Sequence, residues 1–275
     1  MKIMRFADVR GDVHLGFPND DHTVQLLHGA LFDSLSPLDT RALAERMLPP
    51  IDPPNIFGIG LNYRAHATEG NRPVPERPLI FGKVTSSLCG PNDPIVLPAS
   101  APDEVDFEAE LGVVIGRTAR NVSRAEALTY VFGYTAVNDV TARDCQRRLD
   151  QQWTRAKGFD TFCPVGPCLV TADELDPSDL RVRSWLNDEL MQDGHTRDLI
   201  FPVDELVSYL SHQFTLLPGT LICTGTPAGV GVARTPPRFL RAGDVVTVEV
   251  EGIGRLNSPV IADASAKGPI RQRPE

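Results

Sequence analysis

The most regular alternation of apolar and polar residues lies at positions 105–117, VDFEAELGVVIGR. Every second residue from Val105 to Ile115 is apolar, which is the spacing of side chains along one face of a β-strand. The opposite face begins with three acidic residues, among them Glu108 and Glu110, and then turns apolar. Like charges on one strand face repel each other, and glutamate has a low strand propensity. The segment therefore predicts a strand that carries like charges side by side on one face.

Two explanations fit this pair of glutamates. An antiparallel sheet often exposes one face to water, where both charges would simply be solvated. If the face is partly buried, the pair requires a cation, and carboxylate oxygens suit hard divalent ions such as Mg²⁺, Ca²⁺ or Mn²⁺. A third acidic ligand elsewhere in the chain would favour the second explanation.

The remaining patterns predict more strands than helices. A hairpin is expected at 4–17, with its turn at Gly11 and Asp12, and a polar loop with at most a short helix is expected at 64–78. Helical segments are expected at 37–48 (after a cap at Asp39 or Thr40), at the start of 126–144 and at 202–214. Further strands are expected at 55–63, in the rest of 126–144, and at 162–171, 182–188, 220–226 and 244–255. Because strands and helices do not alternate regularly, the fold class expected is α+β with a mixed sheet.

Proline-rich residues 49–54, PPIDPP, form a stiff break in the chain. We expect a small N-terminal domain at 1–50 and a catalytic domain at 51–261. The last residues, 262–275, are expected to form a loose tail.

Composition narrows the possible partners. The net charge is −9, and no cluster of basic residues exceeds a pair such as Arg147 and Arg148, which argues against nucleic acid and anionic membranes as partners. The N-terminus has no apolar signal region and no apolar run is long enough to span a membrane, so a cytoplasmic location is expected. The five cysteines include no C-x-x-C pair and no zinc-like spacing, which indicates free thiols and disfavours a catalytic cysteine.

A third acidic residue, Asp139, ends the predicted strand in GYTAVNDVTARD. Aspartate at a strand end is usually a turn former. Here it is followed by Arg143, Asp144 and Gln146, and then by QWTRAKGFDTFCPVGP, which contains Lys157. This concentration of charged and polar residues marks the region as a candidate site.

With these residues in view, the chain resembles the fumarylacetoacetate hydrolase family. The resemblance covers about 51–256 and rests on six segments in the family's order: GLNYRAHATEG, VDFEAELGVVIGR, VFGYTAVNDVTARDCQ, QWTRAKGFDTFCPVGP, LLPGTLICTGTPAGVG and AGDVVTVEVEGIGRL. It implies a mixed β-sheet roll, often dimeric, with a divalent metal (usually Mg²⁺, with Mn²⁺ or Ca²⁺ as alternatives) in an acidic site.

The resemblance also implies roles for particular residues. Glu108, Glu110 and Asp139 would ligate the metal, whose charge would offset the repulsion between the glutamates. His66 and Glu69 would form the catalytic pair, with the carboxylate holding the imidazole across one helical turn. The charged, proline-rich residues 70–78 that follow suit a lid over the substrate.

Further site residues follow from the same resemblance. Lys157 would face the reacting oxygen as a cation, although an isolated lysine is ordinarily a surface residue. Substrate contacts are expected from Arg143, Gln146, Thr226 and Lys83, and Arg143 could instead be a structural ion-pair partner. Two departures stand out: Val84 follows Lys83 where family members often have proline, and the asparagine in GIGRLNSPV is displaced.

The activity expected is metal-dependent hydrolysis of a C–C bond in an acylpyruvate-like or related β-diketo acid, through a metal-stabilised enolate. An oxaloacetate-type decarboxylase or a 2-hydroxy-dienoate isomerase could use the same residues. A non-catalytic binding protein is a third alternative, which would have no use for a base such as His66. The partners expected are a small keto-acid and a second copy of the chain in a homodimer.

Overall fold

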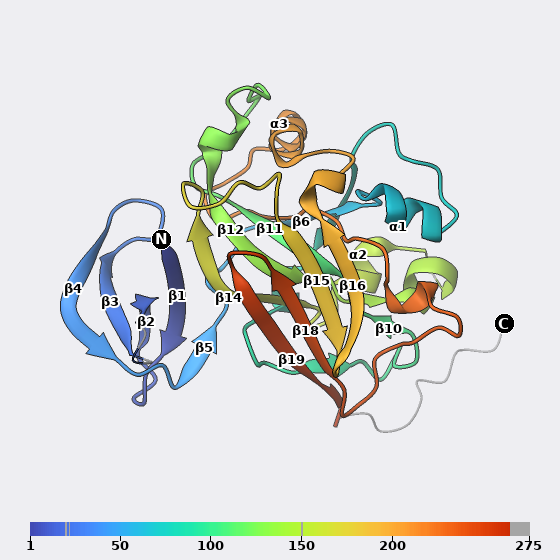
Figure 1. Cartoon of the computed structure of the whole chain (residues 1–275), viewed down its shortest axis with the longest axis horizontal. Coiled ribbons are helices and arrows are strands. Elements are labelled where there is room, and N and C mark those ends of the chain that lie inside the picture. Colours follow the sequence, from blue (N-terminus) through green and yellow to red (C-terminus); the bar gives the residue numbers. More distant parts are fainter. Residues whose placement is uncertain (20, 22, 150, 265–275) are drawn as a thin grey trace.

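The computed structural model describes residues 1–264 except 20, 22 and 150. Within them, mixed β-sheets dominate and helices are few and short, which confirms the α+β class (Figure 1). The largest sheet runs in the spatial order β4 Leu35–Ala42, β3 Val24–Gly29, β2 Val13–Pro18, β1 Lys2–Ala7, β14 Cys163–Thr171, β12 Val131–Asn138, β11 Ala109–Ile115, β17 Leu221–Cys223, β6 Ile56–Gly60 and β7 Leu79–Lys83. Two short strands join it at the side, β5 Arg46–Leu48 beside β1 and β8 Leu88–Cys89 beside β14.

A second sheet packs across the middle of the first. Its order is β16 Glu189–His195, β15 Arg181–Leu186, β18 Val245–Val250, β19 Gly254–Ala262 and β9 Ile95–Leu97. Figure 1 shows β15, β18 and β19 lying over β11, β12 and β14, while β1 to β5 lie at the left of the view, beyond β14. A two-stranded ladder joins β10 Val105–Asp106 to β13 Thr141–Ala142. Most pairs are antiparallel, but β17 with β6, β14 with β8 and β19 with β9 are parallel.

Both faces of the central strands are buried, which explains the sequence of β11. Leu111 and Val113 join the core that also holds Val248 of the second sheet. Val114 on the other face packs in a separate cluster with Ile56. Every residue of β11 is buried, so its glutamate does not stand on a wetted face.

The helices lie at the ends and edges of the sheets. They are the α-helices α1 Arg64–Glu69, α2 Trp153–Lys157 and α3 Val203–Gln213, the π-helix η3 Cys145–Leu149, and the 3₁₀ turns η1 Thr85–Ser87, η2 Ala127–Tyr130, η4 Thr196–Asp198 and η5 Gly231–Ala233. None of the helices in the described part of the chain is both long and apolar enough to cross a membrane.

Several predicted elements are confirmed. The hairpin β1–β2 has its turn around Gly11, whose φ of 84° suits glycine. The short helix in the polar loop is α1, and the helix expected at 202–214 is α3. The strand expected at 105–117 is present as β10 and β11, interrupted at 107 and 108.

The helix predicted at 37–48 is wrong. Residues 35–42 form β4, which pairs with β3, and residues 46–48 form β5, which pairs with β1. The cap residues and helix-forming alanine, leucine and glutamate favour a local helix, but pairing with neighbouring strands overrides that weak preference. Because β4 is the outermost strand of its sheet, Pro37 is tolerated within it.

The predicted domain boundary near residue 50 stays a prediction. Of the predicted tail, Ala262 is still part of β19, and residues from 265 onward lie outside those described.

Candidate metal centre and catalytic pocket

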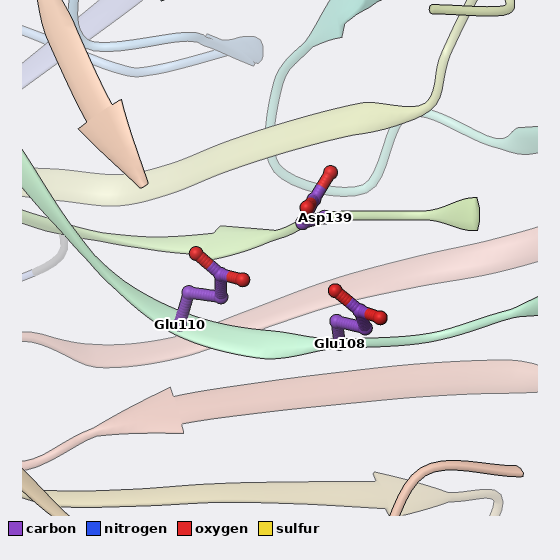
Figure 2. A group of neighbouring side chains, drawn as sticks. All are labelled: Glu108, Glu110 and Asp139. Carbon is purple, nitrogen blue, oxygen red and sulfur yellow. The ribbon is translucent and has the colours of Figure 1, made fainter. Parts of the chain in front are cut away.

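Three carboxylates meet where β11 and β12 lie side by side. Glu110 is in β11, Glu108 lies just before it, and Asp139 follows the last residue of β12. In the register of this antiparallel pair, Ala109 lies opposite Asn138, which brings Asp139 beside Glu108. Each side chain offers an oxygen within 4.8 Å of the others. Figure 2 shows Glu108 and Glu110 extending from one segment toward Asp139. The period of two therefore places both glutamates toward the same aspartate.

Two hydrogen bonds outside the regular β-ladder hold the backbone around the cluster. The N–H of Glu108, in the interruption before β11, donates to Oδ1 of Asn138 at 3.0 Å. The N–H of Asp139 donates to the carbonyl oxygen of Glu108 at 2.9 Å. These two bonds fix the two metal-ligand candidates relative to each other. All three carboxylates are buried, Glu108 being 5% and Glu110 1% exposed, which rules out the solvated-face explanation.

Buried cations neutralise two of the three carboxylates. Nζ of Lys157 lies 2.9 Å from Oε2 of Glu108 and 2.6 Å from Oδ2 of Asp139. Nζ of Lys83 lies 2.7 Å from the other oxygen of Asp139, and the guanidinium of Arg143 lies 2.7 Å from Oε1 of Glu108. Burial alone would raise the pKa of Glu108, but the charges of Lys157 and Arg143 outweigh it and hold that pKa well below its usual range.

Glu110 is different, because no lysine or arginine in the described part of the chain forms an ion pair with it. Its Oε2 accepts the N–H of Gly225 at 2.8 Å. Burial, and next the charges of Asp139 and Glu108, raise the pKa of Glu110 well above its usual range. A divalent cation would supply the missing positive charge and would find three hard oxygen ligands. The residues present thus fit a divalent metal ion.

A histidine–glutamate pair lies beside this cluster on α1. Nδ1 of His66 is 2.8 Å from Oε1 of Glu69, three residues later in the same helix. Oε2 of Glu69 accepts the N–H of Gly229 at 2.9 Å, so the carboxylate is anchored to a second segment. Since a carboxylate can only accept, Nδ1 carries the proton and Nε2 is the basic nitrogen.

One cavity of about 580 Å³ joins these groups. Its wall includes eight residues predicted for the site: His66, Glu69, Glu108, Glu110, Arg143, Gln146, Lys157 and Thr226. The wall does not include Asp139 or Lys83, whose side chains are fully enclosed behind it. Lys83, expected to contact substrate, instead contacts Asp139 and main-chain oxygens of Val140 and Lys157.

Thr226 and Arg143, which were also predicted to contact substrate, bind other groups of the protein itself. The hydroxyl of Thr226 donates to the carbonyl oxygen of Ala109 at 2.9 Å and accepts from Gln192 at 2.7 Å. Arg143 forms ion pairs with Asp106 and Glu108, which is the structural alternative left open by the sequence. Its Nη1 also donates to Oε1 of Gln146 at 3.0 Å.

Two residues that frame the site were not among the predicted ones. Asp106 accepts the N–H groups of Gly231 and Val232 at 2.8 and 3.0 Å and also binds Arg143. It thereby ties one wall of the cavity to the cation that contacts Glu108. The three acidic residues at alternate positions 106, 108 and 110 were a signal for Asp106, but its backbone partners lie 125 and 126 residues away.

Gln192, in β16 of the second sheet, fills all four of its hydrogen-bonding positions. Its Oε1 accepts the N–H of Ala109 at 3.0 Å and the hydroxyl of Ser184 at 2.8 Å. Its Nε2 donates to Thr226 Oγ1 at 2.7 Å and to the carbonyl oxygen of Pro227 at 2.8 Å. Because Ala109 separates Glu108 from Glu110, this one side chain joins the acidic strand to the loop that supplies Gly225 and Gly229. No sequence pattern pointed to it.

Comparison with known proteins places these features in a family. The fumarylacetoacetate (FAA) hydrolase C-terminal family model matches residues 55–261. A 2,4-didehydro-3-deoxy-L-rhamnonate hydrolase of Sphingomonas sp. is 51% identical over 74% of this chain and 72% of its own length. A mitochondrial oxaloacetate tautomerase of Xenopus laevis is 44% identical over 83% of this chain and 72% of its own.

Comparison with solved structures leads to the same family. The crystal structure of a 2-hydroxyhepta-2,4-diene-1,7-dioate isomerase from Mycobacterium marinum superposes with a TM-score of 0.84 at 40% identity. The match covers 96% of this chain and 99% of that one. The chain belongs to the fumarylacetoacetate hydrolase family, and the mixed-sheet fold expected from the resemblance is confirmed.

Proposed function

We propose that this family member is a divalent-metal-dependent hydrolase that cleaves a C–C bond in an acylpyruvate or related β-diketo acid. The observation that carries the proposal is the meeting of two parts in one cavity: the oriented His66–Glu69 pair and the acidic cluster of Glu108 and Glu110. A hydrolase requires a base beside a water molecule and a separate site for the negative charge that develops on the leaving fragment.

His66 supplies the base in this scheme. Glu69 holds Nδ1 protonated, and in the described part of the chain Nε2 has no hydrogen-bond partner. Nε2 can therefore accept a proton from a water molecule that attacks the carbonyl carbon farther from the keto-acid end. Gly229 keeps Glu69, and hence the imidazole, in place during the transfer.

The acidic cluster supplies the second part. Glu108, Glu110 and Asp139 would hold the divalent cation. When bound, that ion supplies Lewis-acid stabilisation of negative charge on the keto-acid oxygens, worth several kcal/mol. Lys157, fixed by Glu108 and Asp139 and present in the cavity wall, adds a second positive charge near the same oxygens.

Keto–enol tautomerisation or double-bond isomerisation of a related keto acid is a second candidate. It is favoured by the names of two similar proteins, the oxaloacetate tautomerase and the 2-hydroxyhepta-2,4-diene-1,7-dioate isomerase. In that case the same Nε2 of His66 would move a proton between carbon and solvent, and no water would attack.

Product analysis separates these reactions. Magnesium-loaded protein is incubated with acetylpyruvate and with oxaloacetate, and products are followed by ¹H NMR. Hydrolysis gives pyruvate and acetate, tautomerisation changes only the keto–enol ratio, and decarboxylation releases CO₂ from oxaloacetate. Loss of acetylpyruvate cleavage in chelated protein and in His66→Ala is the expected control. If acetylpyruvate and longer acylpyruvates stay uncleaved while oxaloacetate is tautomerised, the hydrolase proposal is wrong. Homodimer formation and a cytoplasmic location stay predictions.

A further inference from the structure

Four cationic side chains of arginine or lysine line the cavity, and they fall into two classes. Lys157 and Arg143 are buried, at 2% and 3% exposure. Each is paired with Glu108 and with one aspartate, which is Asp139 for Lys157 and Asp106 for Arg143. Arg72 and Arg147 are exposed, yet both also line the cavity. Exposed residues of a cavity wall lie at its opening, so these two arginines stand at the mouth and the paired cations at the floor.

Neither arginine at the mouth forms an ion pair with an acidic residue in the described part of the chain, which is 1–264 without 20, 22 and 150. The contrast with the adjacent residue is direct, because Arg148 lies outside the cavity and binds Glu104 through two contacts of 2.7 and 3.1 Å. Partial withdrawal of Arg147 from water, and next the charge of Arg143, lower the pKa of Arg147. A guanidinium remains protonated at neutral pH all the same, so Arg147 is a cation held near another cation.

One side of the cavity wall suits a carbon chain. Trp153 and Phe81 both line the cavity and pack edge to face at 5.4 Å between ring centroids. Gly60 lies against Trp153 so closely that a Cβ there would come within 2.4 Å of the indole ring. The absence of a side chain at Gly60 therefore lets the indole sit where it does and gives the cavity an apolar side.

The net charge of the site also bears on which ligand it can hold. Among the described residues, those that line the wall or are linked to it by ion pairs include five acidic side chains, Glu69, Asp106, Glu108, Glu110 and Asp139, and five basic ones, Arg72, Lys83, Arg143, Arg147 and Lys157. Five negative and five positive side chains cancel, so a divalent cation in the acidic cluster would leave an excess of two positive charges. A ligand with two carboxylates would neutralise that excess, whereas a ligand with one would not.

We propose that Arg147, together with Arg72, binds a second carboxylate at the end of the substrate that lies toward the cavity mouth, and so selects dicarboxylic over monocarboxylic keto acids. This inference rests on the proposed function for the orientation of the substrate. A guanidinium presents parallel N–H groups that match the two oxygens of a carboxylate. The apolar side formed by Phe81 and Trp153 accommodates the carbons between the two ends.

The test compares two ligands of equal length, 2-oxoglutarate and 2-oxopentanoate, which differ only in a terminal carboxylate or methyl group. Their binding to the magnesium-loaded full chain is measured by isothermal titration calorimetry, which requires no turnover. Wild-type protein should bind 2-oxoglutarate more tightly. Arg147→Gln should weaken 2-oxoglutarate by roughly 10-fold to 100-fold, the range for a charged hydrogen-bonded contact, and leave 2-oxopentanoate unchanged. Arg72→Gln should act in the same direction.

Arg148→Gln is the matched control, since it removes the same charge from the neighbouring position outside the cavity. It should leave both affinities unchanged. Equal affinities of the two ligands for wild-type protein, no binding of 2-oxoglutarate, or equal effects of the changes at 147 and 148 would each overturn the inference. The kinetic counterpart uses 2,4-dioxoheptanedioate against 2,4-dioxoheptanoate: in Arg147→Gln the KM should rise only for the first. If the binding preference holds while neither compound is cleaved, the proposed hydrolysis fails and the second carboxylate site stands.

Discussion

The ammonium nitrogen of Lys157 lies 2.6 Å from Oδ2 of Asp139, and both side chains are buried. The same nitrogen contacts Glu108 and the hydroxyl of Thr141. Lys157 therefore occupies an oxygen on two of the three carboxylates that we assign to the metal. In the metal-free protein, Lys157 stabilises the buried carboxylates. When a metal ion binds to the same carboxylates, the positive charge of Lys157 repels it.

Replacing Lys157 by methionine should separate these two effects. Metal-free Lys157→Met should lose about 3–5 kcal/mol of unfolding free energy, because buried carboxylates are left without a partner. Magnesium should restore part of this loss, and its affinity should equal or exceed that of wild type, while turnover falls sharply. Denaturant unfolding with and without Mg²⁺ gives the comparison, and the exposed Lys2→Met is the control. Loss of magnesium binding would show that Lys157 supports the metal site rather than competing with it.

The pH dependence of the unfolding free energy tests whether Glu110 is protonated in the metal-free protein. Its raised pKa means that the native metal-free protein holds this proton more tightly than the unfolded chain does. Stability should therefore fall as the pH rises from about 4.3, the ordinary glutamate value, through the raised pKa. Urea unfolding of chelated protein across this window should show that fall in wild type and a flatter profile in Glu110→Gln. Identical profiles would contradict the assignment.

The same variant tests metal ligation. Glu110→Gln should bind Mg²⁺ much more weakly and lose most activity, because the ligand that lacks a cation of its own has become neutral. Equilibrium dialysis measures the bound metal, with Glu126→Gln, at an exposed position, as the control. Undiminished magnesium content in Glu110→Gln would exclude Glu110 as a ligand.

His66→Ala should lower kcat by about 10²- to 10⁴-fold, the usual contribution of a general base. Magnesium affinity should not change, since His66 lies outside the acidic cluster. His212→Ala removes an exposed histidine at the end of α3 and should leave kcat as it is. A wild-type kcat in His66→Ala would show that His66 is not the general base.

Gln192→Leu tests the link between the two sheets. It should lower the unfolding free energy by about 1–3 kcal/mol or more, since the Ala109 N–H and the Pro227 carbonyl lose their partner. Because Ala109 lies between Glu108 and Glu110, magnesium affinity should fall as well. Thermal unfolding and metal titration measure the two effects, and Gln213→Leu, at an exposed position, is the control. A fall in stability with unchanged metal affinity would restrict Gln192 to a structural role.

The features that sequence could predict are those set by local spacing. The spacing of two residues between Glu108 and Glu110 places them together, and the three-residue spacing in α1 places His66 beside Glu69. The sequence also pointed to Asp139 as a third acidic residue, and the family resemblance added its role as a ligand; Asp139 reaches the cluster through the pairing of β11 with β12.

What sequence could not predict depends on contacts between distant segments. Lys83 and Lys157 could be aligned with family positions, but their enclosure beside Asp139 follows from the way β7 and α2 pack. Gln192 acquires its role only because the second sheet lies over β11. The helix expected at 37–48 failed for the same reason, since strand pairing with β3 and β1 decides that segment.

The most direct test of the central claim is the fate of water oxygen during turnover. Magnesium-loaded protein is given an acylpyruvate in H₂¹⁸O, and the acid product is analysed by mass spectrometry at short times against an enzyme-free sample that corrects for exchange of the ketone oxygen. Hydrolysis assisted by His66 predicts one labelled oxygen in the acid above that correction, formed together with pyruvate, and no such product in His66→Ala. Turnover of the keto acid without label entering any acid product would contradict the account.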